Sequence, residues 1–122
     1  MIYKTMTGTG PIQVVQKLWG REEWYFNEKH CLKELYIKPG YACSLHYHPV
    51  KDEGFLVEIG PVTLEVDGVE WKAESGEWVV IPRGTPHRFS NNFAYLATIL
   101  ESSTHHDEAD VVRLEPSRKL KP

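Results

Sequence analysis

Residues 40–60 read GYACSLHYHPVKDEGFLVEIG, and residues 76–91 read GEWVVIPRGTPHRFSN. In the first of these, His46 and His48 are separated by one residue within a segment, residues 42–48, that reads as extended. Successive side chains of a β-strand point to opposite faces, so this spacing places both imidazoles on the same face. The two histidines therefore form half of a predicted metal site.

Two further residues complete a set of four candidate ligands. Glu53 follows Pro49 after a short polar stretch, and Gly54 next to it eases the bend into the following strand. His87 comes directly after a turn at residues 82–86, which aims it from a neighbouring strand into the same space. Three imidazoles and one carboxylate suit one divalent transition metal (Mn, Fe, Co, Ni, Cu or Zn) and leave one or two octahedral positions open for chemistry.

The rest of the chain predicts an all-β fold. Gly and Pro interrupt the sequence at short intervals, and the segments between them are rich in β-branched and aromatic residues. Predicted strands lie at residues 31–38, 55–59, 62–66, 69–73, 77–81 and 95–100. Asp67 and Gly68 favour a type I′ hairpin turn between two of them. Many short strands without a long helical period indicate a sandwich or barrel, while residues 20–27 fit either a turn of helix or a bulged strand.

Both quoted stretches match, position for position, the two sequence motifs of the cupin superfamily. The matching residues are Gly40, His46, His48, Glu53 and Gly60 in the first motif, and Gly76, Pro82, Gly84, His87 and Asn91 in the second. On this resemblance the chain is identified as a single cupin domain of residues 1–122, with motif 1 at 40–60 and motif 2 at 76–91. The resemblance implies a double-stranded β-helix of jelly-roll type, a β-barrel, with metal ligands at His46, His48, Glu53 and His87.

A looser resemblance extends beyond the motifs, to the cupin domain of type II mannose-6-phosphate isomerases. It rests on residues 18–20, 32–40, 44–46, 81–88 and 110–115, while Glu58 and the region around Gly20 depart from that pattern. It implies a metal-dependent isomerase or epimerase acting on a sugar or sugar phosphate. Within that resemblance Glu53 is a possible base, and Lys33 and Arg88 are cations that could hold a phosphate or carboxylate. The more common role of strand Lys and Arg is a solvated surface.

Two other functions fit the same residues. Three histidines with open metal positions also suit an iron or copper dioxygenase, which would consume oxygen. A non-catalytic module that binds a small molecule through its metal is the third alternative, because cupins host many unrelated chemistries. The bifunctional isomerases carry a nucleotidyltransferase domain without a counterpart in these 122 residues, so no guanylyltransferase activity is expected.

Charge and cysteine content narrow the partners. The formal net charge of -3 provides no sequence-wide positive field, so neither nucleic acid nor a membrane surface is an expected partner. Residues 1–11 lack a basic segment followed by an apolar one, and Cys31 and Cys43 read as free thiols, so a cytoplasmic location is expected. The expected partners are a small-molecule substrate and a second copy of the chain, because small jelly rolls leave sheet edges and apolar faces uncovered.

Three further features carry structural expectations. His105 and His106 have metal-binding side chains but lie in a polar segment, so a solvated loop is expected there rather than a second site. The four tryptophans are expected in the core or an interface, with Trp78 pointing into the barrel. Residues 115–122 end in a basic run and are expected to be frayed.

Overall fold

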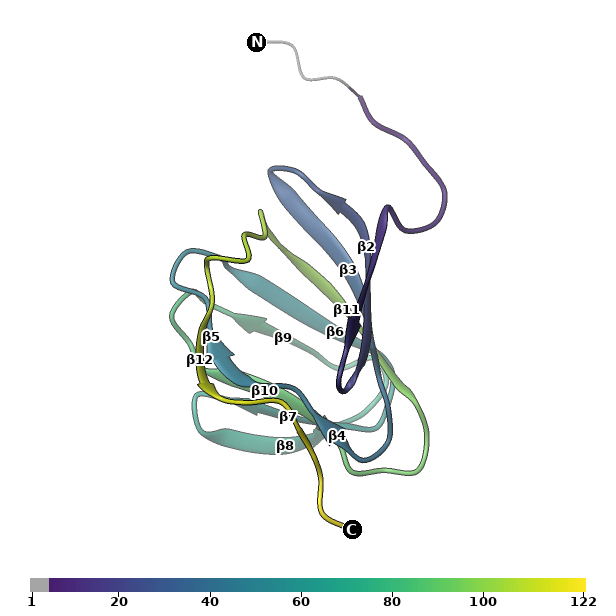
Figure 1. Cartoon of the computed structure of the whole chain (residues 1–122), viewed down its shortest axis with the longest axis vertical. Helices are drawn as coiled ribbons and strands as arrows, with labels where there is room; N and C mark the ends of the chain where they lie inside the picture. Colours follow the sequence, from purple (N-terminus) through teal and green to yellow (C-terminus); the bar gives the residue numbers. More distant parts are fainter. Residues whose placement is uncertain (1–4) are drawn as a thin grey trace.

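The protein is all-β, as predicted. The computed structural model describes residues 5–122, which form two antiparallel sheets (Figure 1). The strands are β1 (Gln13–Lys17), β2 (Gly20–Asn27), β3 (His30–Ile37), β4 (Tyr41–Ala42), β5 (Leu45–Tyr47), β6 (Glu53–Ile59), β7 (Val62–Val66), β8 (Val69–Ala73), β9 (Trp78–Ile81), β10 (His87–Asn91), β11 (Ala97–Thr104), β12 (Val112–Glu115) and β13 (Arg118–Lys119). Residues 1–4 lie outside the described residues. They belong to the predicted domain and to the segment, residues 1–11, in which no leader is predicted.

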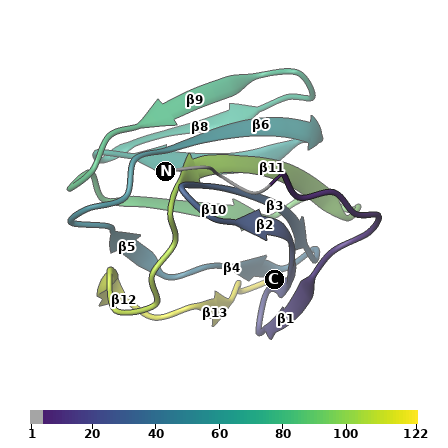
Figure 2. The same ribbon diagram turned by 90° about the horizontal axis from the view of Figure 1, so that it is seen from above.

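The two sheets face each other as in a jelly roll. One sheet has six strands in the order β1-β2-β3-β11-β6-β9. The other has seven: β12-β5-β10-β4-β13 form its main path, and β7 pairs with both β10 and β8. Figure 2 shows β12 and β13 along one side of the molecule, beside β5 and β4, with which they pair.

The interior changes from apolar to polar along the strands. Buried and less buried residues alternate along much of β3, β6 and β11, as the two-residue period of a strand requires. The inward residues are Ile37, Val57 and Ile99 at one end of these strands, and Lys33, Glu53 and Glu101 toward the other. The register keeps the polar residues together, since Lys33 lies directly opposite Glu101 in the β3–β11 pair. The apolar end therefore holds the sheets together and leaves the polar end for a site.

The core is a single cluster of buried side chains from both sheets. Its members are Trp19, Leu35, Ile37, Cys43, Phe55, Val57, Val62, Leu64, Ala73, Ile81, Phe89, Ala97 and Ile99. Trp19 and Phe89 meet edge to face with ring centroids 4.8 Å apart, an arrangement that aromatic quadrupoles favour. Each fully buried aliphatic or aromatic side chain contributes about 1.5–3 kcal/mol relative to exposure.

Most local predictions are confirmed. Asp67 and Gly68 both have positive φ, 52° and 80°, and join β7 to β8 as a type I′ turn requires. Residues 20–27, left open between helix and strand, form β2, which is bulged where its register with β3 shifts between Trp24 and Phe26. Cys31 and Cys43 are buried free thiols.

Two expectations are wrong. The chain end is not frayed at β13, because Arg118 and Lys119 pair with β4 and the amide of Leu120 donates to the carbonyl of Gly40 at 2.8 Å. Charged residues are common on edge strands, where they discourage pairing with other chains, so a basic composition did not exclude a strand. Trp78 does not point inward: it is 73% exposed on the edge strand β9, where Ile81 takes a buried position instead.

Substitution of Gly20 tests the close approach of β2 to β3 at the start of β2. A Cβ at this position would lie 1.8 Å from the backbone oxygen of Tyr36, and neither backbone can move without breaking the β2–β3 pairing. We expect Gly20→Ala to lower the free energy of unfolding by about 3 kcal/mol or more in urea denaturation. Gly68→Ala is the matched control: its Cβ meets open space, so only the cost of positive φ, about 1 kcal/mol, applies. Equal losses in the two variants would contradict the clash.

Candidate metal centre

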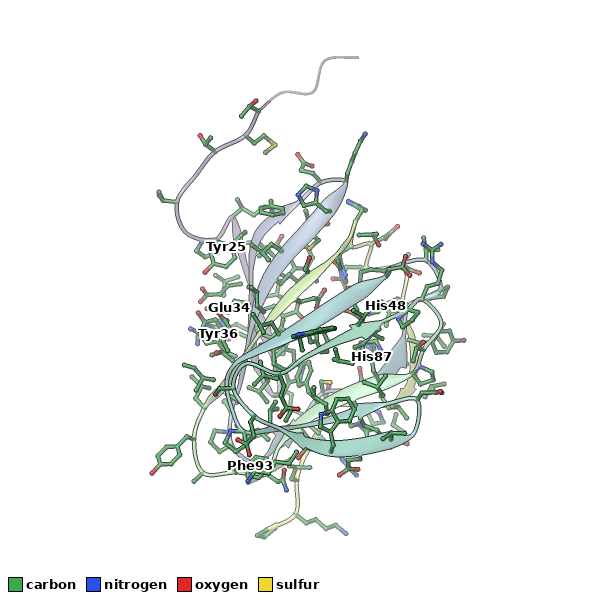
Figure 3. The ribbon with its side chains drawn as sticks, turned by 180° about the vertical axis from the view of Figure 1, so that it is seen from behind. Tyr25, Glu34, Tyr36, His48, His87 and Phe93 are labelled. Atoms are coloured by element: carbon green, nitrogen blue, oxygen red, sulfur yellow. The ribbon has the colours of Figure 1, made fainter. Side chains whose placement is uncertain are left out.

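Three histidines converge at the polar end of the barrel. His46 lies on β5 and faces His87, the first residue of β10, directly across the strand pair, while His48 follows β5. One ligand nitrogen from each of the three comes within 4.8 Å of the others. Figure 3 shows His48 and His87 close together, and their ring centroids are 5.6 Å apart. The three histidines that the sequence singled out therefore form one group that could hold a metal ion.

Backbone carbonyls fix the orientation of each ring. The Nδ1 atoms of His46, His48 and His87 lie 2.8, 2.7 and 2.9 Å from the carbonyl oxygens of Ser44, Asp110 and Thr85. A carbonyl can only accept, so each Nδ1 carries the proton in these bonds. Each Nε2 then keeps its lone pair, the arrangement in which metal-binding histidines are usually held.

Two buried atoms beside the histidine cluster, one on Glu53 and one on His87, lack a hydrogen-bond partner. Glu53 Oε1 lies 2.6 Å from His87 Nε2 and 3.5 Å from His48 Nε2. Despite the short approach, neither Glu53 Oε1 nor His87 Nε2 has a partner in hydrogen-bond geometry. A carboxylate oxygen and an imidazole lone pair directed at one point suit a shared divalent cation, so the residues present fit a metal. Glu53 as the fourth ligand stays a prediction.

The protonation states of His46 and His48 suit a ligand role, whereas for His87 burial lowers the pKa but the Glu53 carboxylate outweighs this and raises it. Burial, with a smaller effect of the neighbouring His87, lowers the pKa of His46 to about 3. Burial also lowers the pKa of His48, more than the Glu53 carboxylate raises it. Both imidazoles are thus neutral near pH 7, the form in which histidine binds metals.

A buried ion pair beside the histidines was missed by the sequence analysis. Lys51 is 2% exposed, and its Nζ lies 3.0 Å from Glu101 Oε2 and 3.6 Å from Glu53 Oε2. Burial lowers the pKa of Lys51, but Glu101 and Glu53 outweigh this and raise it. The only sequence signal for Lys51 is its place inside the first motif, between His48 and Glu53. Glu101 carries no local signal because its partner is fifty residues away.

His106 also belongs to this site, contrary to the expected solvated loop. It is buried, its Nδ1 lies 3.0 Å from Lys51 Nζ, and its Nε2 lies 2.8 Å from Glu108 Oε1. Its ring packs edge to face on Trp24. His105 is exposed as predicted. Among residues 5–122, the histidine cluster found is the one formed by His46, His48 and His87, and the absence of a second metal site at residues 105–106 stays a prediction.

The two predicted anion-binding cations lie in different places. Lys33 is 1% exposed and lines the cavity that His46 and His48 also line, so the common solvated role does not apply to it. Arg88 is 8% exposed and lines a groove on the outer face of its sheet, where it pairs with Glu115 at 3.0 Å. Arg88 follows His87 directly, so the alternation of a strand turns it away from the cavity. The prediction that it holds an anion at the metal site is therefore wrong.

Asp110 is a further residue of the site that the sequence did not indicate. Its carboxylate accepts hydrogen bonds from the amides of Val50 and Lys51, each at 2.9 Å, and its carbonyl accepts from His48. The loop between His48 and Glu53 is thereby tied to the segment before β12.

No helix of the described residues has the length and apolar character of a membrane span.

Comparison with known proteins identifies the sequence family. The family described as "Cupin domain" matches residues 34–101. ManC of Salmonella typhimurium, a mannose-1-phosphate guanylyltransferase, is 27% identical over 83% of this chain and 22% of its own length. Quercetin 2,3-dioxygenase of Bacillus subtilis is 42% identical over 41% of this chain and 15% of its own length. The matches span from 15% to 40% of the curated relatives' lengths, so this chain corresponds to a minor part of each.

Solved structures agree on the fold. KdgF from Halomonas sp. superposes with a TM-score of 0.73 at 15% identity, over 84% of this chain and 98% of that one. A cupin sugar phosphate isomerase from Silicibacter pomeroyi gives a TM-score of 0.61 at 21% identity, over 72% of this chain and 68% of that one. With ManC, this match supports the distant resemblance to mannose-6-phosphate isomerases that the sequence indicated.

Removal of one histidine should empty the metal site. We expect His48→Ala to lower transition-metal affinity by more than about 100-fold, because a buried ligand held by Asp110 is lost while the apolar core is untouched. Elemental analysis of untagged protein, purified without chelator, measures the stoichiometry. His105→Ala, an exposed histidine outside the cluster, is the matched control and should keep about one metal per chain. Unchanged metal content in His48→Ala would refute the assignment.

Acid should destabilise the metal-free protein through His46. Its pKa is about 3 when folded and about 6.5 when unfolded, so between these pH values the unfolded chain binds a proton that the folded chain does not. Stability from this group is therefore lost as the pH falls from 6.5 toward 3. We expect the free energy of unfolding to fall by up to about 3 kcal/mol more in wild type than in His46→Gln between pH 7 and 4. His105→Gln should follow wild type, and parallel curves for all three proteins would contradict this origin.

Proposed function

This chain belongs to the cupin family, and from that premise we propose that it is a metal-dependent isomerase or epimerase acting on a hydroxy-carbonyl compound of the sugar or sugar-phosphate class. A divalent cation held by His46, His48, His87 and Glu53 would polarise the carbonyl group of the substrate. The reaction then needs a proton to move between neighbouring carbon atoms, and that part falls to the protein.

The observation that carries this proposal is the buried pair of Lys51 and Glu101 beside the histidines. Both residues line the same cavity as His46 and His48. Burial raises the pKa of Glu101, but Lys51 outweighs this and lowers it to about 2, so the carboxylate is ionised. The pair thus presents a charged ammonium and an ionised carboxylate side by side, the acid and base that proton transfer requires.

The roles of these residues follow from their positions. Glu53 directs Oε1 toward the histidines and Oε2 toward Lys51, so it has no free oxygen for the base role that the sequence suggested. In our proposal the Glu101 carboxylate accepts the proton, and the Lys51 ammonium donates to the oxygen on which negative charge develops. His106 holds Lys51 from the other side, with its Nδ1 3.0 Å from the ammonium.

A dioxygenase is the second candidate function. The match to quercetin 2,3-dioxygenase covers 50 residues at 42% identity, and three histidines with one carboxylate also suit iron or copper. The buried acid–base pair favours the isomerase, because oxygen activation does not call for a paired ammonium and carboxylate. Oxygen uptake by the iron-loaded or copper-loaded protein would instead favour the dioxygenase over the isomerase. Ligand binding without turnover in either assay would favour a non-catalytic binding module.

The partners and location remain proposals of the same kind. A small-molecule substrate follows from the enclosed site, and a cytoplasmic location follows from the two free thiols. A homodimer would cover the exposed Leu56, Trp78 and Val80 on the outer face of the six-stranded sheet. Light scattering measures this oligomeric state directly.

Proton transfer can be measured without knowing the natural substrate. We expect the metal-loaded protein to exchange a carbon-bound proton with D₂O, without oxygen, for at least one member of a panel of aldoses, ketoses, their phosphates and the corresponding sugar acids. Lys51→Met should lower that exchange rate by about 10²–10⁴-fold, the usual contribution of a positioned acid or base. NMR integration of the substrate proton gives the rate.

Lys72→Met, which changes an exposed lysine on β8, is the matched control and should exchange like wild type. Metal content and urea unfolding are measured for each variant, and Glu101→Gln should lose exchange even if Lys51→Met does not fold. Absence of exchange across the panel in wild type, or unchanged exchange in both active-site variants, would refute the proposed function.

A further inference from the structure

Lys33 is a buried cation that the proposed proton transfer does not use. Its side chain enters the cavity from β3, and its Nζ lies 3.4 Å from Glu22 Oε1 and 3.9 Å from the centroid of the Trp24 ring. A charge is costly to bury unless it is well paired. Lys33 is only 1% exposed, so its positive charge needs a negatively charged partner.

The local partners of Lys33 are weak or shared. Glu22 Oε1, its nearest carboxylate oxygen, also accepts from Trp24 Nε1 at 2.9 Å, and Glu22 Oε2 lies 4.0 Å from the ammonium of Lys17. Glu101 is opposite Lys33 in the strand register, but its Oε2 bonds Lys51 at 3.0 Å instead. Lys33 therefore has one long hydrogen bond and one aromatic face, with capacity for a further acceptor.

Lys51, the other buried lysine, has stronger local partners. Its ammonium meets Glu101 and His106, each at 3.0 Å, and faces Glu53 at 3.6 Å. Two of its three donors are therefore engaged at hydrogen-bond distance, and the third is left for the oxygen of the proposed substrate. An anion entering the cavity would find in Lys33 the buried cation with the weaker set of partners.

The charge of the loaded cavity also favours an anion. Before metal is counted, four cations (Lys17, Lys33, Lys51 and Arg113) and three carboxylates (Glu22, Glu101 and Glu108) line the cavity, and the Glu53 carboxylate beside Lys51 makes the number equal. Histidine binds a metal as the neutral imidazole, so a divalent cation would add its two positive charges without compensation. An anionic ligand would restore the balance of charge inside the cavity. The dielectric constant of a protein interior is low, so the attraction between opposite charges is strong there.

We propose that Lys33 anchors a carboxylate of the substrate, which makes the substrate a hydroxy- or oxo-carboxylic acid instead of a neutral sugar. A carboxylate is favoured over phosphate because Lys33 is buried, while Lys17 and Arg113, which also line the cavity, are partly or fully exposed; phosphate sites commonly gather several donors or an arginine fork. Arg88, the arginine expected to join it, lies on the opposite face of β10. The cavity volume of about 90 Å³ also suits the smaller group. This inference narrows the substrate class of the proposed isomerase, while the anion site itself requires no turnover.

Binding of pyruvate to the zinc-loaded protein tests the anchor, with inorganic phosphate and neutral dihydroxyacetone as comparison probes. The indole N–H resonance of Trp24 reports on the site, because this indole lies under the Lys33 ammonium and donates to its carboxylate partner. We expect pyruvate to shift this resonance with saturation and to bind at least about tenfold more tightly than dihydroxyacetone. Lys33→Met should weaken pyruvate binding at least about tenfold, as the loss of a charge-assisted hydrogen bond predicts.

Two controls separate the anchor from a loss of folding. Lys119→Met removes an exposed lysine on β13 and should bind pyruvate like wild type. Glu22→Gln releases Lys33 from its carboxylate partner and should strengthen pyruvate binding severalfold, a gain that a damaged fold cannot produce. Unchanged binding in both Lys33→Met and Glu22→Gln would overturn the anchor. Phosphate that binds more tightly than pyruvate, and weakens in Lys33→Met, would overturn the carboxylate and assign phosphate instead.

The outcome is separable from that of the proposed function. Pyruvate binding that depends on Lys33, together with no proton exchange in any assay, would leave the anion site standing and refute the isomerase. Proton exchange that depends on Lys51, together with pyruvate binding that is unchanged in Lys33→Met, would support the isomerase and refute the anion site.

Discussion

The pairing of His46 with His87 across β5 and β10 is the constraint on which the site depends. It brings the two sequence motifs to one point, because β5 belongs to the first and β10 ends the second. Each of the three imidazoles is then turned by a bond from Nδ1 to a backbone carbonyl, at Ser44, Asp110 or Thr85. Since these acceptors are main-chain atoms, the direction of every Nε2 is tied to the fold and not to side chains that could swing. The barrel thus prepares the cluster before a ligand arrives, which lowers the ordering cost of binding.

The same strands place charges where an apolar core would be more stable. Buried ion pairs often contribute little net stability, because desolvation offsets their attraction. The interior nevertheless holds Lys33 on β3, Glu101 on β11 and Lys51 in the loop between β5 and β6. The apolar cluster at the other end of the barrel, from Ile37 to Ile99, supplies the stability that this arrangement gives up. A fold that keeps such groups buried beside the histidine cluster is organised around a site more than around maximal stability.

Much of the site was predictable because the motif residues act through local spacing. His46 and His48 share a strand face, and His87 follows a turn rich in Pro and Gly, so their convergence needs little long-range information. Lys51 and His106 could not be found in this way. Each owes its burial to a partner about fifty residues away, and no pattern in either segment records that contact. Arg88 failed for a local reason: it is next to His87, and adjacent strand residues point to opposite faces.

Glu53 explains why a second carboxylate stands beside Lys51. Its Oε1 approaches His87 Nε2 to 2.6 Å and its Oε2 faces the Lys51 ammonium at 3.6 Å, so a single side chain serves both a cation site and a buried lysine. A divalent cation at the histidines would draw the negative charge of Glu53 toward itself and weaken its hold on Lys51. Without another partner the ammonium would then be a poorly compensated buried charge, which is costly. Glu101, at 3.0 Å, supplies that partner, so Lys51 can stay charged and in place whether or not Glu53 is engaged by a cation.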